Sequence, residues 1–136
     1  MSTQLPPQVV ERADLRGNEY AWRPEDFLDA LSTAASRGLA CIGGQFQFRV
    51  ADGTCEMYWL SADSADRAER EKWSDYVARC EREVRVGFTR ILETVDFRRE
   101  ANSFEHLQEK IASSGFDLMA HLCFVAYFVD EHDQSA

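Results

Sequence analysis

Residues 39–60 read LACIGGQFQFRVADGTCEMYWL, and this stretch predicts a β-hairpin. Apolar and polar side chains alternate along its first half, with Phe46, Phe48 and Val50 on one face and Gln45, Gln47 and Arg49 on the other. A period of two is the pattern of a strand that buries one face. The dipeptide Asp52-Gly53 predicts a two-residue type I′ turn, because both central residues of that turn need positive φ.

This turn sets a register between the two strands. The predicted pairs are Arg49 with Glu56, Phe48 with Met57, Gln47 with Tyr58 and Phe46 with Trp59. The register assigns one face to the core (Phe46, Phe48, Met57, Trp59) and the other to solvent (Gln47, Arg49, Glu56, Tyr58). It places apolar partners opposite one another and an arginine opposite a carboxylate. Near the start of the first strand, Gly43-Gly44 predicts a bulge or the close approach of another backbone.

Three helices are predicted around the hairpin. The first begins at Pro24, where the missing N–H of proline costs nothing, and ends before Gly38. A long helix spans about residues 64–94, along which apolar residues recur at steps of three and four. A third helix spans residues 103–114, with Asn102 as its N-cap.

Residues 119–129 are apolar almost throughout, so both a buried strand and a buried helix fit them. The β-branched and aromatic residues in their second half favour the strand. The chain therefore predicts a single α+β domain over residues 1–136. Its sheet is expected to have three or four mainly antiparallel strands, including the hairpin at 39–60, with helices on one face. Residues 1–19 are expected to form an irregular lead-in, and residues 131–136 a frayed acidic tail.

The chain has 136 residues and a formal net charge of −9, with its excess of acids toward both ends. Such a field repels nucleic acid and anionic membrane surfaces and attracts a basic partner. The first residues lack the basic start and apolar run of a secretory signal, and no apolar run reaches the roughly 20 residues that span a bilayer. A cytoplasmic protein is therefore expected, with its four cysteines as free, buried thiols.

No catalytic residue, metal site or cofactor site is predicted. His121 and Cys123 could share one face of the last strand, and His106 lies one helix earlier, but nothing in their spacing predicts the convergence that a zinc site needs. The chain has no glycine-rich phosphate loop between a strand and a helix, and no serine has the neighbours of a nucleophile elbow. These absences favour binding over catalysis.

Two groups of residues are predicted to bind a partner. The first is the outward face of the hairpin: Gln47, Arg49, Glu56 and Tyr58. Tyr and Arg are enriched at the energetic centres of interfaces. The second group extends this patch with the acids of the first helix: Glu25, Asp26 and Asp29. Solvent exposure or cover by another element explains the same hairpin residues, and the helix dipole already accounts for two of the acids.

A resemblance to small bacterial immunity proteins rests on three runs: YAWRPEDFLDAL at 20–31, GLACIGGQFQFR at 38–49 and DGTCEMYWL at 52–60. Such proteins are encoded beside polymorphic toxins that contact-dependent or type VI secretion delivers. The resemblance carries no functional residue over by position. It implies a cytosolic protein that binds a cognate toxin domain and blocks its active site. An acidic inhibitor suits a toxin with a basic site, such as a nuclease or a nucleotide-handling enzyme.

A second interpretation is a small-molecule-binding or enzymatic domain. Its pocket is expected between the sheet and the long helix, lined by Trp59, Trp73 and Tyr127. A third interpretation is a structural subunit of a homo-oligomer.

Overall fold

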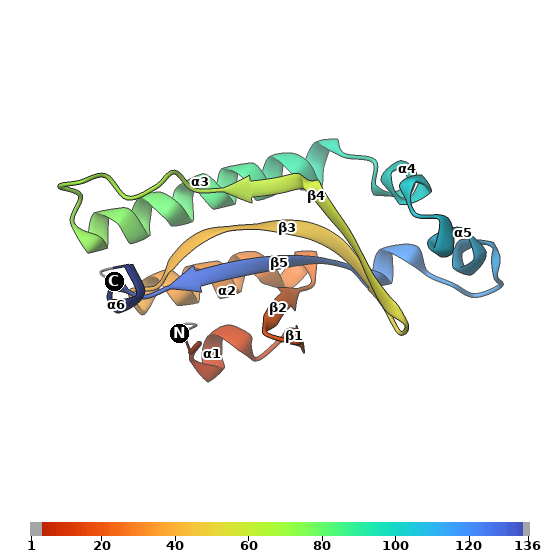
Figure 1. The fold of residues 1–136 in the computed structure, drawn as a ribbon, viewed down its shortest axis with the longest axis horizontal. Coiled ribbons are helices and arrows are strands. Elements are labelled where there is room, and N and C mark those ends of the chain that lie inside the picture. The colour runs from red at the N-terminus through yellow and green to blue at the C-terminus, as the bar shows by residue number, and fades with distance from the viewer. Residues whose placement is uncertain (1–3, 135–136) are drawn as a thin grey trace.

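The chain forms a five-stranded antiparallel sheet with helices packed on one face (Figure 1). The computed structural model describes residues 4–134. In the order of the sheet, the strands are β1 (Ala13–Arg16), β2 (Glu19–Trp22), β5 (Leu122–Val129), β3 (Ala40–Val50) and β4 (Gly53–Asp63). The α+β prediction is confirmed, although the sheet has more strands than the three or four expected.

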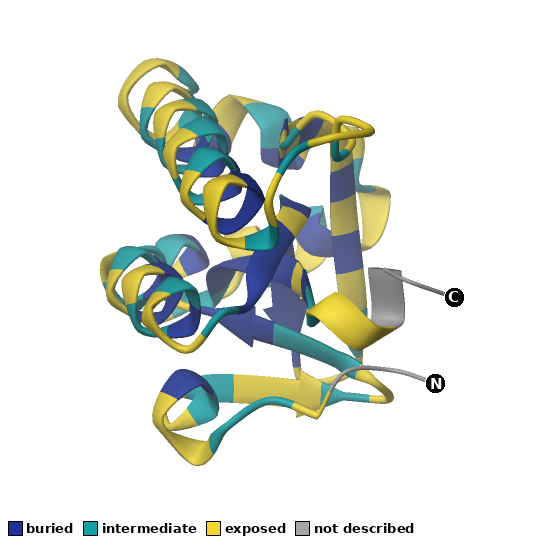
Figure 2. Cartoon of the chain, turned by 90° about the vertical axis from the view of Figure 1, so that its left-hand side faces the viewer, coloured by how far each residue is buried: buried dark blue, intermediate teal, exposed yellow. Residues whose placement is uncertain are grey.

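Six α-helices and two 3-10 turns connect and cover the strands described. The helices are α1 (Pro7–Val10), α2 (Pro24–Ser36), α3 (Trp73–Thr94), α4 (Phe97–Glu100), α5 (Glu105–Ala112) and α6 (Glu131–Gln134). The 3-10 turns are η1 (Ala101–Ser103) and η2 (Leu118–His121). Figure 2 shows the two longest helices, α2 and α3, on the same side of the sheet. None of the helices in residues 4–134 is long and apolar enough to cross a membrane.

Four phenylalanine rings form the centre of the core, where α2 and α3 pack on the sheet. They are Phe27 of α2, Phe46 of β3, Phe88 of α3 and Phe124 of β5. Their neighbouring centroids lie 4.6–5.2 Å apart, in tilted, stacked and edge-on pairs. All four side chains are fully buried. Each such pair stabilises the fold by about 0.5–1.5 kcal/mol beyond the apolar area that it buries.

The last strand, β5, lies between β2 and β3 in the middle of the sheet. Its Val125 pairs with Ala21 on one side and with Gln45 on the other. Seven of its eight residues are buried or half-buried, which explains why its sequence is almost continuously apolar. The choice of a strand for this segment is confirmed, while its first residues belong to the 3-10 turn η2.

The hairpin is confirmed, but its predicted turn and register are wrong. Val50 pairs with Gly53, so the loop is Ala51-Asp52, and neither loop residue has positive φ. Two tertiary contacts hold this tip and override the local preference for a type I′ turn. Arg16 of β1 donates a hydrogen bond to the Gly53 carbonyl at 3.1 Å, and Lys110 of α5 lies 3.0 Å from the Asp52 carboxylate.

A bulge of three residues in β4, Tyr58 to Leu60, places Trp59 differently from the prediction. Phe46 pairs with Met57, but the preceding Gln45 pairs with Ser61. The residues between Met57 and Ser61 therefore have no partner on β3, and the side chains beyond them change faces. Leu60 is buried as a result, whereas Trp59, predicted to be core, is 44% exposed. The Trp59 indole N–H donates to the Glu100 carboxylate at 2.8 Å, which ties β4 to α4.

The first 19 residues are not an irregular lead-in. Within residues 4–19 the chain forms α1, β1 and the start of β2, while residues 1–3 lie outside the described part. Gly17, with φ of 61°, supplies the left-handed residue in the turn between the two strands. The Trp22 indole N–H donates to the Val9 carbonyl at 3.0 Å, which fixes α1 against the sheet. Strands of four residues are too short for their periodicity to be recognised.

The first predicted helix is confirmed as α2, with Arg23 in extended conformation as its N-cap. Trp22 and Phe27 pack across its start with centroids 5.9 Å apart, as in a hydrophobic staple.

The third predicted helix begins two residues late, at Glu105. Asn102 does not cap it, because this residue belongs to the turn η1. The acidic tail is predicted to be frayed from residue 131, but residues Glu131–Gln134 form the helix α6. Residues 135–136 lie outside the described part.

The long helix α3 begins at Trp73, nine residues later than predicted. Residues 64–72 have no apolar stripe, and helices derive most of their stability from packing such a stripe. Arg79 instead holds these residues as an ordered loop. Its guanidinium donates to both carboxylate oxygens of Glu71, at 2.8 and 2.9 Å, and to the carbonyls of Ala65 and Asp66 at 3.1 Å.

The Gly43-Gly44 pair behaves as predicted. The register between β3 and β5 shifts between Cys41 and Gly43, and Gly43 has φ of 138°. A side chain at Gly44 would overlap the Val125 carbonyl oxygen and lie 2.6 Å from the Phe124 ring. Only glycine therefore allows β5 to approach β3 at this point.

Gly44→Ala is expected to destabilise the fold by about 2–3 kcal/mol, because the clash is with backbone and with a core ring rather than with a flexible side chain. Thermal denaturation followed by circular dichroism would measure the loss. Gly53→Ala is the matched control, since a Cβ there meets nothing within 4 Å and the φ of Gly53 is not positive. Equal melting temperatures for the two variants would contradict the close approach.

The loop at residues 64–72 is expected to loosen at low pH. Hydrogen bonds from Arg79 lower the pKa of Glu71 from 4.5 to about 2. A lowered pKa means that the interaction is complete above about pH 4.5 and is lost as the pH falls toward 2. Hydrogen-exchange protection of the Ala68 amide, which donates to Glu71 at 3.1 Å, should therefore fall over that range.

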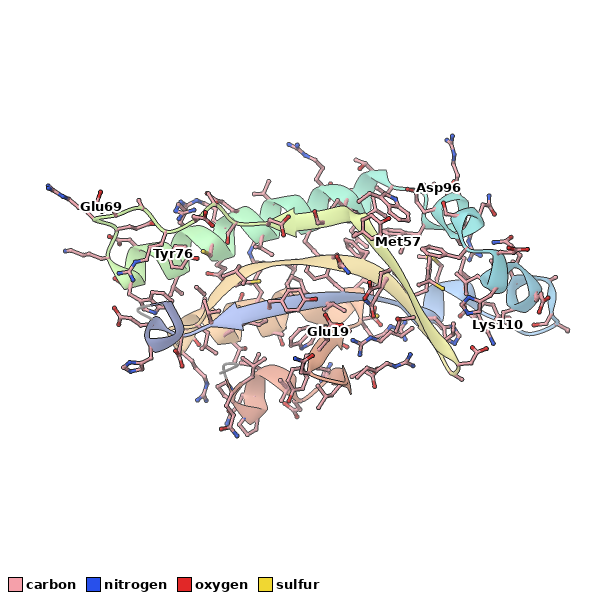
Figure 3. The ribbon with its side chains drawn as sticks, viewed as in Figure 1. Glu19, Met57, Glu69, Tyr76, Asp96 and Lys110 are labelled. Carbon is pink, nitrogen blue, oxygen red and sulfur yellow. The ribbon has the colours of Figure 1, made fainter. Side chains whose placement is uncertain are left out.

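Glu71→Gln should lower the protection of the same amide already at pH 7. Glu69→Gln is the control, because the exposed Glu69 lies at the outer end of the same loop (Figure 3). Protection that is equal in both variants at pH 7 would show that the Glu71 carboxylate does not hold the loop.

Candidate protein-binding surface

The face of the sheet opposite α2 and α3, called here the helix-free face, carries the polar residues of the hairpin. Phe46 and Phe48 point into the core, so the alternation of β3 places Gln47 and Arg49 on the helix-free face. Both are nevertheless buried, at 1% and 7% exposure. The prediction that Gln47 and Arg49 are open to a partner is therefore wrong.

The β1–β2 hairpin covers these two side chains through hydrogen bonds to Arg49. The guanidinium donates to the Asp14 carbonyl at 2.7 Å, the Asp14 carboxylate at 3.0 Å and the Glu19 carbonyl at 3.0 Å. Its Nε donates to the Gln47 side-chain oxygen at 2.7 Å. Arg49 thus links β3 to both strands of the N-terminal hairpin.

The sheet curls enough for its two edge strands to meet across this face. Arg16 lies on β1 and Gly53 on β4, at opposite edges of the sheet, yet they are hydrogen-bonded. In Figure 2 the β1–β2 hairpin runs beneath the sheet toward the tip of β4. The turn residues Gly17-Asn18 are the sequence signal that marks this hairpin.

Away from this contact between β1 and the tip of β4, called here the curled end, the helix-free face carries carboxylates and aromatic rings that are exposed or half-buried. They are Glu19 of β2, Glu56 and Tyr58 of β4, and Tyr127 of β5, called here the acid–aromatic strip. Tyr58 is 70% exposed and Tyr127 39% exposed. Glu56 and Tyr58 flank the buried Met57, and Tyr127 lies between the buried Ala126 and Phe128, so these side chains point away from the core. Figure 3 shows Glu19 beside the middle of β5.

Tyr127 and Glu19 are joined by a hydrogen bond. The phenol of Tyr127 donates to the Glu19 carboxylate. Burial, the hydrogen bond and the negative charge of Glu19 raise the pKa of Tyr127 above its ordinary value, with a smaller effect from Glu56. The phenol therefore stays protonated at neutral pH and remains a donor. The strip thus presents at Tyr127 a ring whose hydroxyl is already oriented.

A hollow of about 450 Å³ adjoins Tyr127. It opens where β2 separates from β5, beyond the last pair of Ala21 with Val125. The large apolar and aromatic side chains that line it are Leu5, Leu15, Tyr20, Tyr127 and Phe128, and its polar side chains are Gln4 and Asn18. The hollow is large enough to receive a long side chain from a partner.

The acids of the first helix are not part of this surface. Glu25 and Asp26 lie on α2, which packs on the opposite face, and Asp29 follows one turn later. Arg23 lies 3.4 Å from Glu25, and Arg12 lies 3.3 Å from Asp26. Of the predicted partner-binding residues, Glu56 and Tyr58 therefore lie on the acid–aromatic strip, whereas the three acids lie apart from it.

The aromatic pocket of the alternative interpretation is not formed. Trp59 hydrogen-bonds to Glu100, the Trp73 indole donates to the Gly38 carbonyl at 2.8 Å, and Tyr127 lies on the helix-free face. These three rings do not converge, and the space between the sheet and α3 is filled by the phenylalanine cluster of the core.

The thiols and imidazoles do not form an activated nucleophile. Cys55 lies 3.9 Å from the Nδ1 of His106, a proximity that the sequence did not indicate. Burial and the Asp52 carboxylate raise the pKa of Cys55, so the thiol stays neutral. The Nδ1 of His121 donates to the Asp117 carbonyl at 2.8 Å, and its ring stacks on Phe116.

No three His, Cys, Asp or Glu side chains converge among the described residues in a way that would hold a metal ion. Comparison of the chain with family models, curated proteins and solved structures found no match. The surfaces of the chain itself are therefore the basis for inferring a function.

Replacing Arg49 by methionine is expected to destabilise the fold by about 2–3 kcal/mol. The change leaves the Asp14 and Glu19 carbonyls and the Gln47 amide without their donor. Urea denaturation would measure the loss. Arg12→Gln is the control, because Arg12 is 75% exposed in its ion pair and such pairs contribute about 0–1 kcal/mol. Equal losses for both variants would contradict the central role of Arg49.

Proposed function

We propose that this chain is a non-enzymatic protein-binding domain that binds a basic partner through the acid–aromatic strip. The exposure of Tyr58 and Tyr127 beside Glu19 and Glu56 is the observation that carries the proposal. Exposed tyrosines supply large contact area at a low cost in side-chain entropy. The adjoining carboxylates add the charge that attracts lysine and arginine.

The hollow beside Tyr127 suits a lysine or arginine side chain as the anchor of the partner. Its apolar lining would bury the aliphatic stem, as it does for long charged side chains elsewhere. The charged end would then lie near the Tyr127 ring and the Glu19 carboxylate. A cation over an aromatic ring contributes about 0.5–2 kcal/mol, depending on how far it is desolvated.

The resemblance to immunity proteins gives this proposal its specific form. The partner is then a toxin domain with a basic active site, and the bound chain blocks substrate access to that site. The formal net charge of −9 supports fast, salt-sensitive association with such a domain. A cytoplasmic location follows from the same role.

Co-expression with the toxin-like product of a neighbouring gene tests the proposal. The chain is expected to restore growth of cells that express the toxin domain and to bind it in a stable complex. Tyr58→Ala is expected to weaken binding at least about thirtyfold, since truncating a central tyrosine costs about 2 kcal/mol or more and each 1.4 kcal/mol is a factor of ten. Glu56→Lys should chiefly slow association and reduce its dependence on salt.

Glu93→Ala, at an exposed position on α3, is the matched control and should leave affinity unchanged. Circular dichroism would establish that all variants fold alike. Two results would refute the proposal: no basic domain encoded nearby binds the chain, or Tyr58→Ala binds as tightly as the α3 control.

A further inference from the structure

Four arginines surround one pocket at the curled end of the helix-free face. The pocket has a volume of about 160 Å³ and is lined by Arg12, Arg16, Arg23, Arg49, Asp14, Ala21, Ala120, His121 and Cys123. Asp14 is the one carboxylate among these residues. In a chain whose formal net charge is −9, the lining of this pocket is cationic.

Two of these arginines are held in place by backbone carbonyls. Arg49 donates to the carbonyls of Asp14 and Glu19, and Arg16 donates to that of Gly53. A carbonyl orients a guanidinium without neutralising its charge. The Asp14 carboxylate is shared between them, at 3.0 Å from Arg49 and 3.5 Å from Arg16, so the pair keeps a net positive charge.

The other two arginines are exposed, and each is held by an ion pair with a carboxylate. Arg12 pairs with Asp26 at 3.3 Å and Arg23 with Glu25 at 3.4 Å, and both guanidinium groups are exposed. Exposed ion pairs of this kind contribute only about 0–1 kcal/mol, so a ligand can displace the carboxylates. Arg23 also comes directly before α2 and lines the same pocket as Arg16 and Arg49.

The remaining side chains do not oppose an anion. Burial raises the pKa of Cys123 to about 11, partly offset by Arg49, Arg16 and Arg23, so the thiol carries no charge. Ala21 and Ala120 are small and leave the pocket open. The nearest acids outside the lining are Asp26 and Glu25, which pair with Arg12 and Arg23. Acids more than about 8–10 Å away are screened at physiological salt, whereas the guanidinium groups act at contact distance.

We propose that this pocket binds the phosphate group of a small ligand. The planar donors of arginine match a phosphate in two-point contacts, and several guanidinium groups together favour a dianion over a single carboxylate. The volume is below the roughly 300–1,000 Å³ of pockets that enclose drug-sized ligands, so the rest of the ligand lies outside. The pocket is separate from the acid–aromatic strip, and this inference does not depend on the proposed partner.

Calorimetric titration and thermal denaturation of the full chain with inorganic phosphate test this site. Sodium acetate serves as the carboxylate probe, and sodium chloride holds the ionic strength constant in every sample. Phosphate is expected to bind saturably and to raise the melting temperature, because a ligand that binds only the folded state stabilises it. No saturable response to phosphate, or an equal response to acetate, would overturn the proposal.

The double variant Arg12→Gln, Arg23→Gln locates the response. Both side chains are exposed, so the variant should fold, and it is expected to bind phosphate at least about tenfold more weakly than the unaltered chain. Arg90→Gln, Arg98→Gln makes the same change in net charge at exposed positions elsewhere and should leave the dissociation constant within about twofold. Equal phosphate affinity for the two double variants would place binding outside the pocket and overturn the proposal.

Discussion

The four packed phenylalanine rings of the core determine which side of the two central strands, β3 and β5, faces inward. Phe46 and Phe124 come from adjacent strands, and a slip of one residue in either strand would move its ring to solvent. Since strand side chains alternate, the same packing places Gln47 and Arg49 on the helix-free face. A buried arginine needs partners, and the N-terminal hairpin supplies them. The apolar core thus determines where the polar network forms.

Regular patterns made the class of fold predictable. Alternation indicated the hairpin, proline and the staple indicated α2, and the aromatic and β-branched run indicated β5. The features that could not be predicted depend on contacts between distant residues. Arg16 and Lys110 set the turn, Arg79 orders the loop that was expected to be helical, and the bulge at Tyr58–Leu60 exchanges the faces of β4. The candidate surface was predicted in part, because Glu56 and Tyr58 are exposed but Gln47 and Arg49 are not.

The helix-free face carries two different kinds of chemistry. At its curled end, short strands and backbone carbonyls hold guanidinium groups around a small pocket. Further along the same face, carboxylates and tyrosines lie beside the hollow at Tyr127. Glu19 lies on the strip and connects it to the pocket, since its carboxylate accepts from Tyr127 and its carbonyl accepts from Arg49. Arg49 therefore supports the strip as well as the pocket, although its own side chain is buried.

The central position of β5 has a consequence for how the chain is made in the cell. Translation produces β2 and β3 long before β5, which separates them in the finished sheet. Until residue 129 has left the ribosome, both earlier strands have an unpaired edge, and such edges can pair with other nascent chains. Pairing between residues so far apart in sequence is also slow. The nascent chain therefore passes through a period of exposure to aggregation, in which a chaperone that shields strand edges would raise the yield of folded protein.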